Sequence, residues 1–201
     1  SESGTVGGAL LDRVAEAGLG ASSFAAIGNR ADVSANDLLQ YWADDDRTRL
    51  VLLYLESFGN ARKFSRIARE VSRTKPVVAV RSGGAARAYP SDGDLGPDTL
   101  HALFDQTGLI RVATLSQQLD VARVLACQPL PAGPRVALVG NGGGSLALAA
   151  DACVDAGLTL ADLGEGVRTA VADAGGGSAA RVRASTVDLG FEAVGADLSR
   201  T

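Results

Sequence analysis

Cysteine is scarce in this sequence, and the little that is present excludes two kinds of site. Cys127 and Cys153 stand far apart, and neither belongs to a CxxC pair. Cysteine-based zinc sites and the disulfide frameworks of small secreted domains need closer, repeated spacings. We therefore expect two reduced, partly buried thiols and no metal site built on them.

Basic blocks and long apolar runs are also missing. The 19 basic residues are scattered among 23 acidic ones, so the charge pattern of a nucleic-acid-binding protein is absent. The longest apolar run, LVLLYL, is far too short to span a bilayer, and we expect no signal peptide. No acidic run has the spacing of a magnesium or calcium loop. We expect a cytoplasmic protein without a nucleic-acid, membrane or metal partner.

What the sequence does contain is an alternation of helical and strand-like patterns. The order predicts an α/β fold in which a parallel, doubly wound sheet is covered by helices on both faces. The expected helices are 5–18, 34–45, 60–73, 97–108 and 115–127, and the expected strands are 22–28, 49–57, 75–84 and 109–112.

A second copy of this pattern begins after a proline-rich break. Residues 128–134 read as a linker, and residues 135–163 again give a strand, a glycine-rich loop, a helix and a strand. We therefore expect two consecutive domains, 1–127 and 135–201. The pattern fades from Gly164 onward. A strand is expected before the first loop, so both domains are predicted to be truncated in this fragment.

Two glycine-rich stretches, SESGTVGG and GNGGGS, stand where helices begin. Glycine lets backbone N–H groups approach an anion, and the positive end of the helix dipole favours negative charge. Neither stretch is a GxGxxG fingerprint or a P-loop, and tight packing alone is an alternative explanation for each. Together, the two helix N-termini could hold one phosphoryl group between them.

The stretches GNRADVSANDLLQYW and LYLESFGNARKF resemble the ligase domain of NDP-forming acyl-CoA synthetases, relatives of succinyl-CoA synthetase. PLPAGPRVALVGNGGGSLALAADACVDAGL is similar to the domain that follows it there. The resemblance covers roughly residues 1–163. It implies a flavodoxin-like fold repeated twice, with two "power helices" that embrace a phosphohistidine.

The resemblance also implies site residues. Glu56 falls where the family has a carboxylate that orients the phosphorylated imidazole. Without the family, Glu56 still follows a buried strand, where open α/β sheets place their sites, although it could merely cap the next helix. The implied phosphate loops are Ser1, Ser3, Gly4 and Thr5 in the first domain, and Asn141, Gly142, Gly143 and Gly144 in the second.

The phosphoryl acceptor of the family is absent from its expected place. Active members carry Ser-His-Thr-Gly there, and aligning its glycine with Gly93 puts Pro90, Ser91 and Asp92 in front. Ser91 or Asp92 could be phosphorylated instead, or Asp92 could itself occupy the anion site. The only histidine, His101, is expected on the surface or side of a helix in a structural role.

These residues leave three hypotheses. NDLLQYWADDDRTRLVLLYLESFGNARKFSRIAREVSR most resembles the region fused to GNAT-type domains in bacterial lysine acetyltransferases, which suggests a silent regulatory module that responds to acyl-CoA or nucleotide. The second hypothesis is an active ADP-forming acetate or acyl-CoA ligase with an unusual or separately supplied acceptor. The third is a dimerisation platform. Phosphoryl transfer needs a nucleophile in the loop, which favours the first hypothesis over the second.

The resemblance implies partners as well. No cofactor is expected in this fragment, whereas CoA or acyl-CoA and Mg-ATP are implied for the parent family. The expected partners are the CoA-binding, ATP-grasp and GNAT-type domains of the parent chain, small anions such as phosphate, and a second copy in a homodimer.

Overall fold

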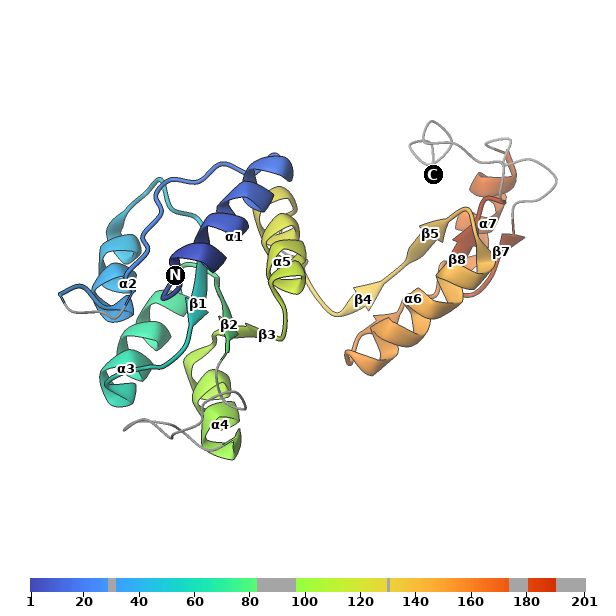
Figure 1. The fold of residues 1–201 in the computed structure, drawn as a ribbon. Helices are drawn as coiled ribbons and strands as arrows, with labels where there is room; N and C mark the ends of the chain where they lie inside the picture. The colour runs from blue at the N-terminus through green and yellow to red at the C-terminus, as the bar shows by residue number, and fades with distance from the viewer. Residues whose placement is uncertain (29–31, 83–96, 130, 174–180, 191–201) are drawn as a thin grey trace. The chain divides into compact units, whose positions relative to one another are not determined.

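The chain forms two compact units, Ser1–Leu130 and Pro131–Thr201 (Figure 1). The computed structural model describes residues 1–28, 32–82, 97–129, 131–173 and 181–190.

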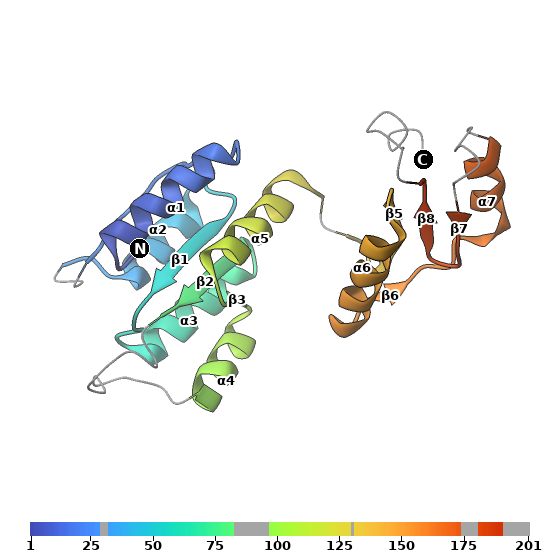
Figure 2. The same ribbon diagram turned by 45° about the vertical axis from the view of Figure 1, so that its right-hand side comes forward.

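In the first unit, strands and helices alternate along the chain. Its elements are α1 (Gly4–Glu16), α2 (Ala35–Asp44), β1 (Val51–Leu55), α3 (Ala61–Ser72), β2 (Val77–Arg81), α4 (Pro97–Thr107), β3 (Ile110–Val112) and α5 (Leu115–Cys127). Within the described residues the strands form one parallel sheet in the order β1-β2-β3. Helices lie on both of its faces, as the alternating pattern predicts (Figures 1 and 2).

The two faces of the sheet are covered by different helices. Val51, Leu53 and Leu55 of β1 point into the main core, which they share with apolar residues of α2, α3 and α4. On the opposite face, α5 places the fully buried side chain of Gln118 over the strands. Its Nε2 donates to the carbonyl oxygens of Leu53 and Val78, both at 2.9 Å. The side-chain amide of Gln118 therefore bonds to both β1 and β2 on the face that α5 covers.

Short polar side chains stabilise the N-terminal ends of α2 and α3. The carboxylate of Asp37 accepts from the backbone N–H of Ser34 at 3.0 Å, ahead of α2. Asn60 caps α3, because its Oδ1 accepts from the N–H of Lys63 at 2.9 Å. The N-cap residue of α3 is therefore Asn60 and not Glu56.

The strand expected over residues 22–28 does not form. The segment is extended, but its recorded ladder partner is Ser1 alone: the Ser1 amino group donates to the Ala25 carbonyl (2.8 Å), and the Ile27 N–H donates to the Ser1 carbonyl (2.9 Å). Phe24 is 46% exposed. The apolar pattern is present, but among the described residues the segment has no long strand beside it.

The second unit is smaller and has a less extensive core. Its elements are β4 (Arg135–Val136), β5 (Leu138–Gly140), α6 (Gly143–Asp155), β6 (Thr159–Leu160), α7 (Gly164–Asp173), β7 (Arg181–Val182) and β8 (Thr186–Asp188). β4 pairs with β6 and β5 with β8, both in parallel, while β7 is antiparallel to β8. The structure thus contains α7, β7 and β8 from Gly164 onward, where periodicity in the sequence is poor.

The apolar length of the helices and the exposure of the two cysteines can be compared with the sequence predictions. No helix in the described part of the chain is long and apolar enough to cross a membrane. Both cysteines are free thiols, as expected. Cys153 is half-buried, but Cys127, the last residue of α5, is exposed, so the expectation of burial is wrong for that residue.

Candidate anion site at the carboxyl end of the sheet

The N-terminus of α1 lies at the carboxyl end of β1. The backbone N–H of Glu2 donates to the carbonyl of Tyr54 at 3.1 Å, which holds the residues ahead of α1 beside the end of the strand. Open α/β sheets place their ligand sites at this end of the strands. The predicted residues Ser1, Ser3, Gly4, Thr5 and Glu56 all belong to the segments that meet here.

The first turn of α1 presents backbone donors. Ser3 is the N-cap, and its Oγ accepts from the N–H of Val6 at 3.3 Å, while Ser1 Oγ bonds the backbone of Ser3. The N–H groups of Gly4 and Thr5 have no acceptor among the residues that the structure describes, and both residues are exposed. Space around Gly4 is open. An anion can therefore approach these N–H groups at the positive end of the helix.

Glu2 is the buried carboxylate of this edge, and sequence reasoning missed it. The residue is 8% exposed, and its Oε2 accepts from the backbone N–H of Glu56 (2.6 Å) and of Ser57 (3.0 Å). The carboxylate therefore fixes the backbone from which the Glu56 side chain projects. The sequence does carry a sign of this role, because an acidic residue stands between two serines just before a helix begins.

The end of β2 adds a hydroxyl pair and a cation, which were also missed. Tyr54 Oη and Ser82 Oγ are 2.5 Å apart, and the N–H of Ser82 donates to the Leu55 carbonyl. The guanidinium carbon of Arg81 lies 5.7 Å from the centre of the Phe58 ring. The edge thus combines helix N–H donors, hydroxyls and a half-buried positive charge, all of which suit a small oxyanion.

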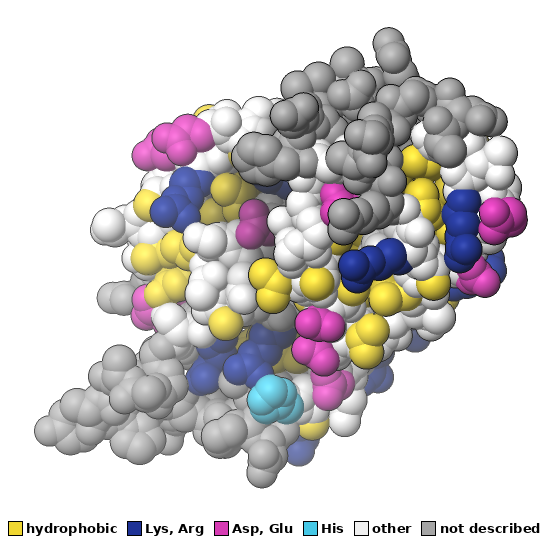
Figure 3. Space-filling view, turned by 90° about the vertical axis from the view of Figure 1, so that its right-hand side faces the viewer, with side chains coloured by type: hydrophobic (Ala, Val, Ile, Leu, Met, Phe, Trp, Pro, Cys, Tyr) yellow, Lys and Arg dark blue, Asp and Glu magenta, His cyan; other side chains and the backbone are white. Residues whose placement is uncertain are grey.

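The lone histidine lies on the surface of α4. His101 is exposed on α4, where its ring nitrogens lie 3.1 and 3.3 Å from Nη1 of Arg111 (Figure 3). Arg111 stands in the middle of β3, opposite Ala79, rather than at the carboxyl end. The surface position expected for His101 is confirmed. Pro90, Ser91 and Asp92 lie outside the described residues.

The second glycine-rich turn begins α6 in the second unit. Gly142 is the N-cap, and a methyl group at Gly143 would lie 3.1 Å from Oδ2 of Asp188, at the end of β8. Asp188 Oδ1 accepts from the N–H of Gly190. A carboxylate therefore already stands beside the positive end of α6, and sequence reasoning missed it. The roles of Asn141, Gly142, Gly143 and Gly144 in phosphate binding stay predictions.

The chain is similar to known proteins over most of its length. The model of the succinyl-CoA ligase-like flavodoxin domain matches residues 1–125. The α subunit of acetate–CoA ligase (ADP-forming) I from Pyrococcus furiosus is 38% identical over 168 residues, which are 81% of this chain and 36% of that protein. The 4-hydroxybutyrate–CoA ligase (ADP-forming) of Nitrosopumilus maritimus is 33% identical, with 81% of this chain and 24% of that protein covered.

A solved structure from the same group of enzymes is also similar to this chain. The dinucleotide-forming acetyl-coenzyme A synthetase 1 of Ca. Korarchaeum cryptofilum, in complex with phosphate and ADP, has a TM-score of 0.83 and 26% identity, covering 96% of this chain and 43% of that one. This chain thus spans about a quarter to two fifths of the relatives it matches. Its parallel α/β sheet, its glycine-rich helix start and the family model agree: the chain belongs to the family of succinyl-CoA ligase-like flavodoxin domains.

Proposed function

We propose that the carboxyl edge of the first unit is a phosphate site in an acyl-CoA synthetase-like module that has lost its phosphoryl acceptor. The observation that carries the proposal is the first turn of α1. It offers two outward N–H groups at Gly4 and Thr5, beside a backbone that Glu2 holds in place. Such a turn binds a dianion without any further chemistry.

Loss of the acceptor supports a regulatory role. The sole histidine of the chain contacts Arg111 on the surface, and the sequence has Pro90, Ser91 and Asp92 where family members carry the acceptor loop. A nucleophile is required for phosphoryl transfer, whereas binding requires only donors. The module would then respond to acyl-CoA or nucleotide in a parent protein that acetylates lysines through a GNAT-type domain.

The proposed architecture has two flavodoxin-like domains, 1–127 and 135–201, joined by residues 128–134. In it, Asn141 to Gly144 form the second phosphate loop, and Glu56 would orient the bound group. CoA and Mg-ATP would bind to the CoA-binding and ATP-grasp domains of the parent chain. The relatives named as ADP-forming ligases support this set of ligands.

A second candidate is an active ADP-forming acetate or acyl-CoA ligase whose acceptor is unusual or is supplied by another segment. The observation that favours it is the identity of 33–38% to proteins that are named as such ligases. If the unusual acceptor belongs to this chain, Ser91 or Asp92 would become phosphorylated.

Phosphate titration tests the site directly. Gly4 is the first residue of α1, and Ser3 before it is extended (φ −117°, ψ 123°), so proline fits at position 4 and removes one N–H without breaking the helix. We expect Gly4→Pro to weaken phosphate binding at least about tenfold, because a hydrogen bond to a charged group contributes about 1.5–3 kcal/mol. Gly8→Ala, in the same helix, is the control. Equal affinities for both variants and the wild type would refute the site.

Phosphorylation separates the two candidates. The chain is incubated with Mg²⁺, γ-labelled ATP and the β subunit of an ADP-forming acetate–CoA ligase, then examined by peptide mass spectrometry. We expect phosphate binding without covalent label. Label on Ser91, Asp92 or His101 would make the chain part of a working ligase and would overturn the regulatory proposal.

A further inference from the structure

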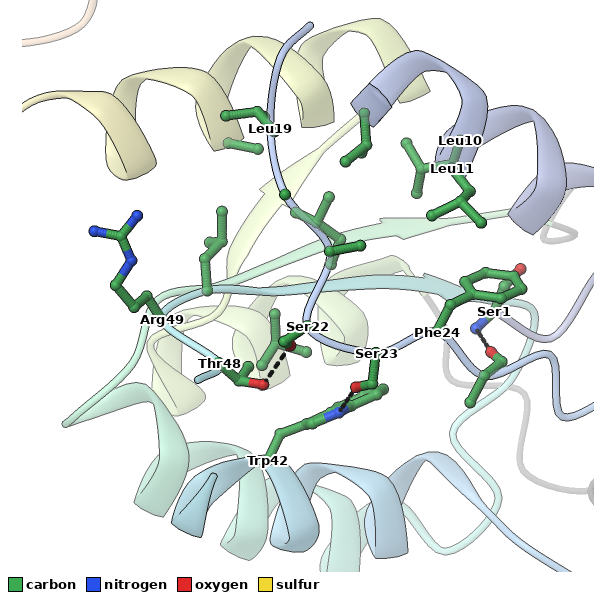
Figure 4. Close-up of a pocket in the computed structure, with 18 of the residues that line it drawn as sticks. Ser1, Leu10, Leu11, Leu19, Ser22, Ser23, Phe24, Trp42, Thr48 and Arg49 are labelled. Atoms are coloured by element: carbon green, nitrogen blue, oxygen red, sulfur yellow. Dashed lines mark hydrogen bonds between the residues drawn. The ribbon is translucent and has the colours of Figure 1, made fainter. Parts of the chain in front are cut away.

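Two hollows of the first unit differ in how their polar groups are bonded. One, of about 460 Å³, lies between segment 19–25 and β1 (Figure 4). Polar groups of its wall bond one another: Ser22 Oγ lies 2.7 Å from Thr48 Oγ1, and Trp42 Nε1 donates to Ser23 Oγ at 2.7 Å. The other, of about 520 Å³, is a groove between α3 and α4 that is lined by arginines. The groove is therefore the hollow that suits a charged ligand.

Three arginines of α3 line the groove in one row. Arg62, Arg66 and Arg69 are exposed, and their spacing of four and three residues places them on one face of the helix. The row extends about 10 Å along the helix axis, at about 1.5 Å per residue. No acidic residue lines the groove within the described residues. The groove is therefore locally positive in a chain whose net charge is -4.

Arg69 is held in position, whereas the other two arginines are available to a partner. The Nε of Arg69 donates to the carbonyl oxygen of Gln106 on α4 at 3.0 Å, which joins the two walls of the groove. In the part of the chain that the structure describes, Arg62 and Arg66 have no recorded ion pair. Their guanidinium groups can therefore form bidentate pairs with carboxylates.

Apolar side chains line the groove beside the arginines. Ala61 comes from α3, and Ala102 and Leu103 come from α4. The two helices contact each other and share the main core, so the groove is a fixed feature of the fold (Figures 1 and 2). An apolar surface bordered by arginine is typical of protein–protein interfaces, in which arginine is enriched.

We propose that the groove between α3 and α4 binds an acidic amphipathic helix of a partner polypeptide. Glutamates at positions i, i+4 and i+7 of such a helix have the same spacing as the three arginines, and apolar side chains next to them would contact Ala61, Ala102 and Leu103. A small anion would reach only part of a row that is about 10 Å long. The helix would bind whether or not the carboxyl edge of the sheet holds a phosphate.

Peptide binding tests the groove. The probe is a fluorescently labelled peptide of about 16 residues, long enough to form a helix. It has glutamates at positions i, i+4 and i+7 and leucines at i+1, i+5 and i+8, and a matched peptide has glutamine in place of glutamate. Fluorescence anisotropy at low ionic strength compares the wild type with Arg62→Gln/Arg66→Gln. The control is Arg73→Gln/Arg123→Gln, which removes the same charge outside the groove.

We expect the groove variant to bind the acidic peptide about tenfold more weakly than the wild type does, because two exposed ion pairs are lost. The control variant should bind as the wild type does, and added salt should weaken binding. The four substituted side chains are exposed, so the fold should be retained, which the melting temperatures check.

Three results would overturn the proposal. Equal affinity of the wild type and the groove variant for the acidic peptide, or no binding to either, would show that the groove does not take this helix. Equal affinity of the wild type for the acidic and the glutamine peptides would indicate apolar contact without charge pairing. Displacement of the acidic peptide by an equal concentration of ADP would assign the arginines to a phosphorylated ligand.

Discussion

Oε2 of Glu2 lies 2.6 Å from the backbone nitrogen of Glu56, a residue 54 positions away in the sequence. The same oxygen accepts from Ser57 at 3.0 Å. A single buried carboxylate thus joins the turn before α1 to the turn after β1, and it positions the two segments that form the candidate site.

Replacement of Glu2 by alanine should destabilise the first unit. Two half-buried backbone N–H groups would lose their acceptor, which costs up to about 1–3 kcal/mol for each group left unsatisfied. Urea denaturation measures the change. Glu16→Ala, at the exposed end of α1, is the matched control and should change stability little. If Glu2→Ala proved as stable as this control, the two N–H groups would not depend on the carboxylate. Water would then have to accept their hydrogen bonds in its place.

Two neighbouring glycines of α1 should respond oppositely to alanine. A methyl group at Gly7 would lie 2.7 Å from Phe24 Cζ and 2.8 Å from Ser1 Cβ, whereas one at Gly8 would meet nothing within 4 Å. We expect Gly7→Ala to lower the melting temperature. Gly8→Ala should raise stability by up to about 1 kcal/mol through helix propensity. The pair is compared by thermal unfolding, and effects of the same sign would contradict the close packing at Gly7.

Gln118 should contribute strongly to the stability of the first unit. It donates from a fully buried position to carbonyls on two strands, so Gln118→Ala removes two hydrogen bonds and leaves a void. The expected loss is about 2–4 kcal/mol. Denaturant titration beside Asp120→Ala, an exposed position of the same helix, isolates the effect. A loss no larger than that of the control would show that the bonds contribute nothing net.

Acid should weaken the start of α2 in a defined pH range. The hydrogen bond from the Ser34 hydroxyl, followed by that from the Ser34 N–H, holds the pKa of Asp37 below its ordinary value. A lowered pKa means that the stabilisation is complete above the unfolded value, about 3.9, and is lost as the pH falls through the folded value. The stability difference between wild type and Asp37→Ala should therefore be constant near neutrality and shrink below about pH 4. A pH-independent difference would refute this linkage.

Neutralisation of Asp188 should improve anion binding in the second unit. Its carboxylate stands beside Gly143 at the start of α6, where its negative charge would repel a phosphate that approached the N–H groups of this turn. We expect Asp188→Asn to raise phosphate affinity, as followed by amide NMR shifts at Gly143 and Gly144. Asp155→Asn, at the far end of α6, is the control. An unchanged affinity would remove Gly142 to Gly144 from the site.

Much of the fold was predictable because the residues that determine it are close in sequence. Ser34, Asn60 and Thr114 cap the helices that the periodicity predicts, and the apolar runs 51–55 and 77–81 form the expected strands. Segment 22–28 shows the limit of this reasoning. An apolar strand pattern needs a neighbour on which to pair, and periodicity cannot say whether one is present.

The site was predictable only in part, for a related reason. The glycine-rich stretch at the start of α1 carries a local signature, and the family resemblance named Ser3, Gly4 and Thr5 within it as candidates. Glu2 and Asp188 could not be placed, because their roles depend on contacts with segments that are distant in the sequence. The Glu56 carboxylate was noticed, but nothing local indicated that another carboxylate holds its backbone.

The span of the Glu2 bonds also concerns the order of folding. Helix α1 can form from its own residues, but the bonds to Glu56 and Ser57 close a loop of 54 and 55 residues, and such closures come at an entropic cost that local contacts avoid. The complete edge is therefore absent from any partly folded chain in which only α1 has formed. An anion that recognises the whole edge distinguishes native from nascent protein, and in doing so it favours completion of the fold.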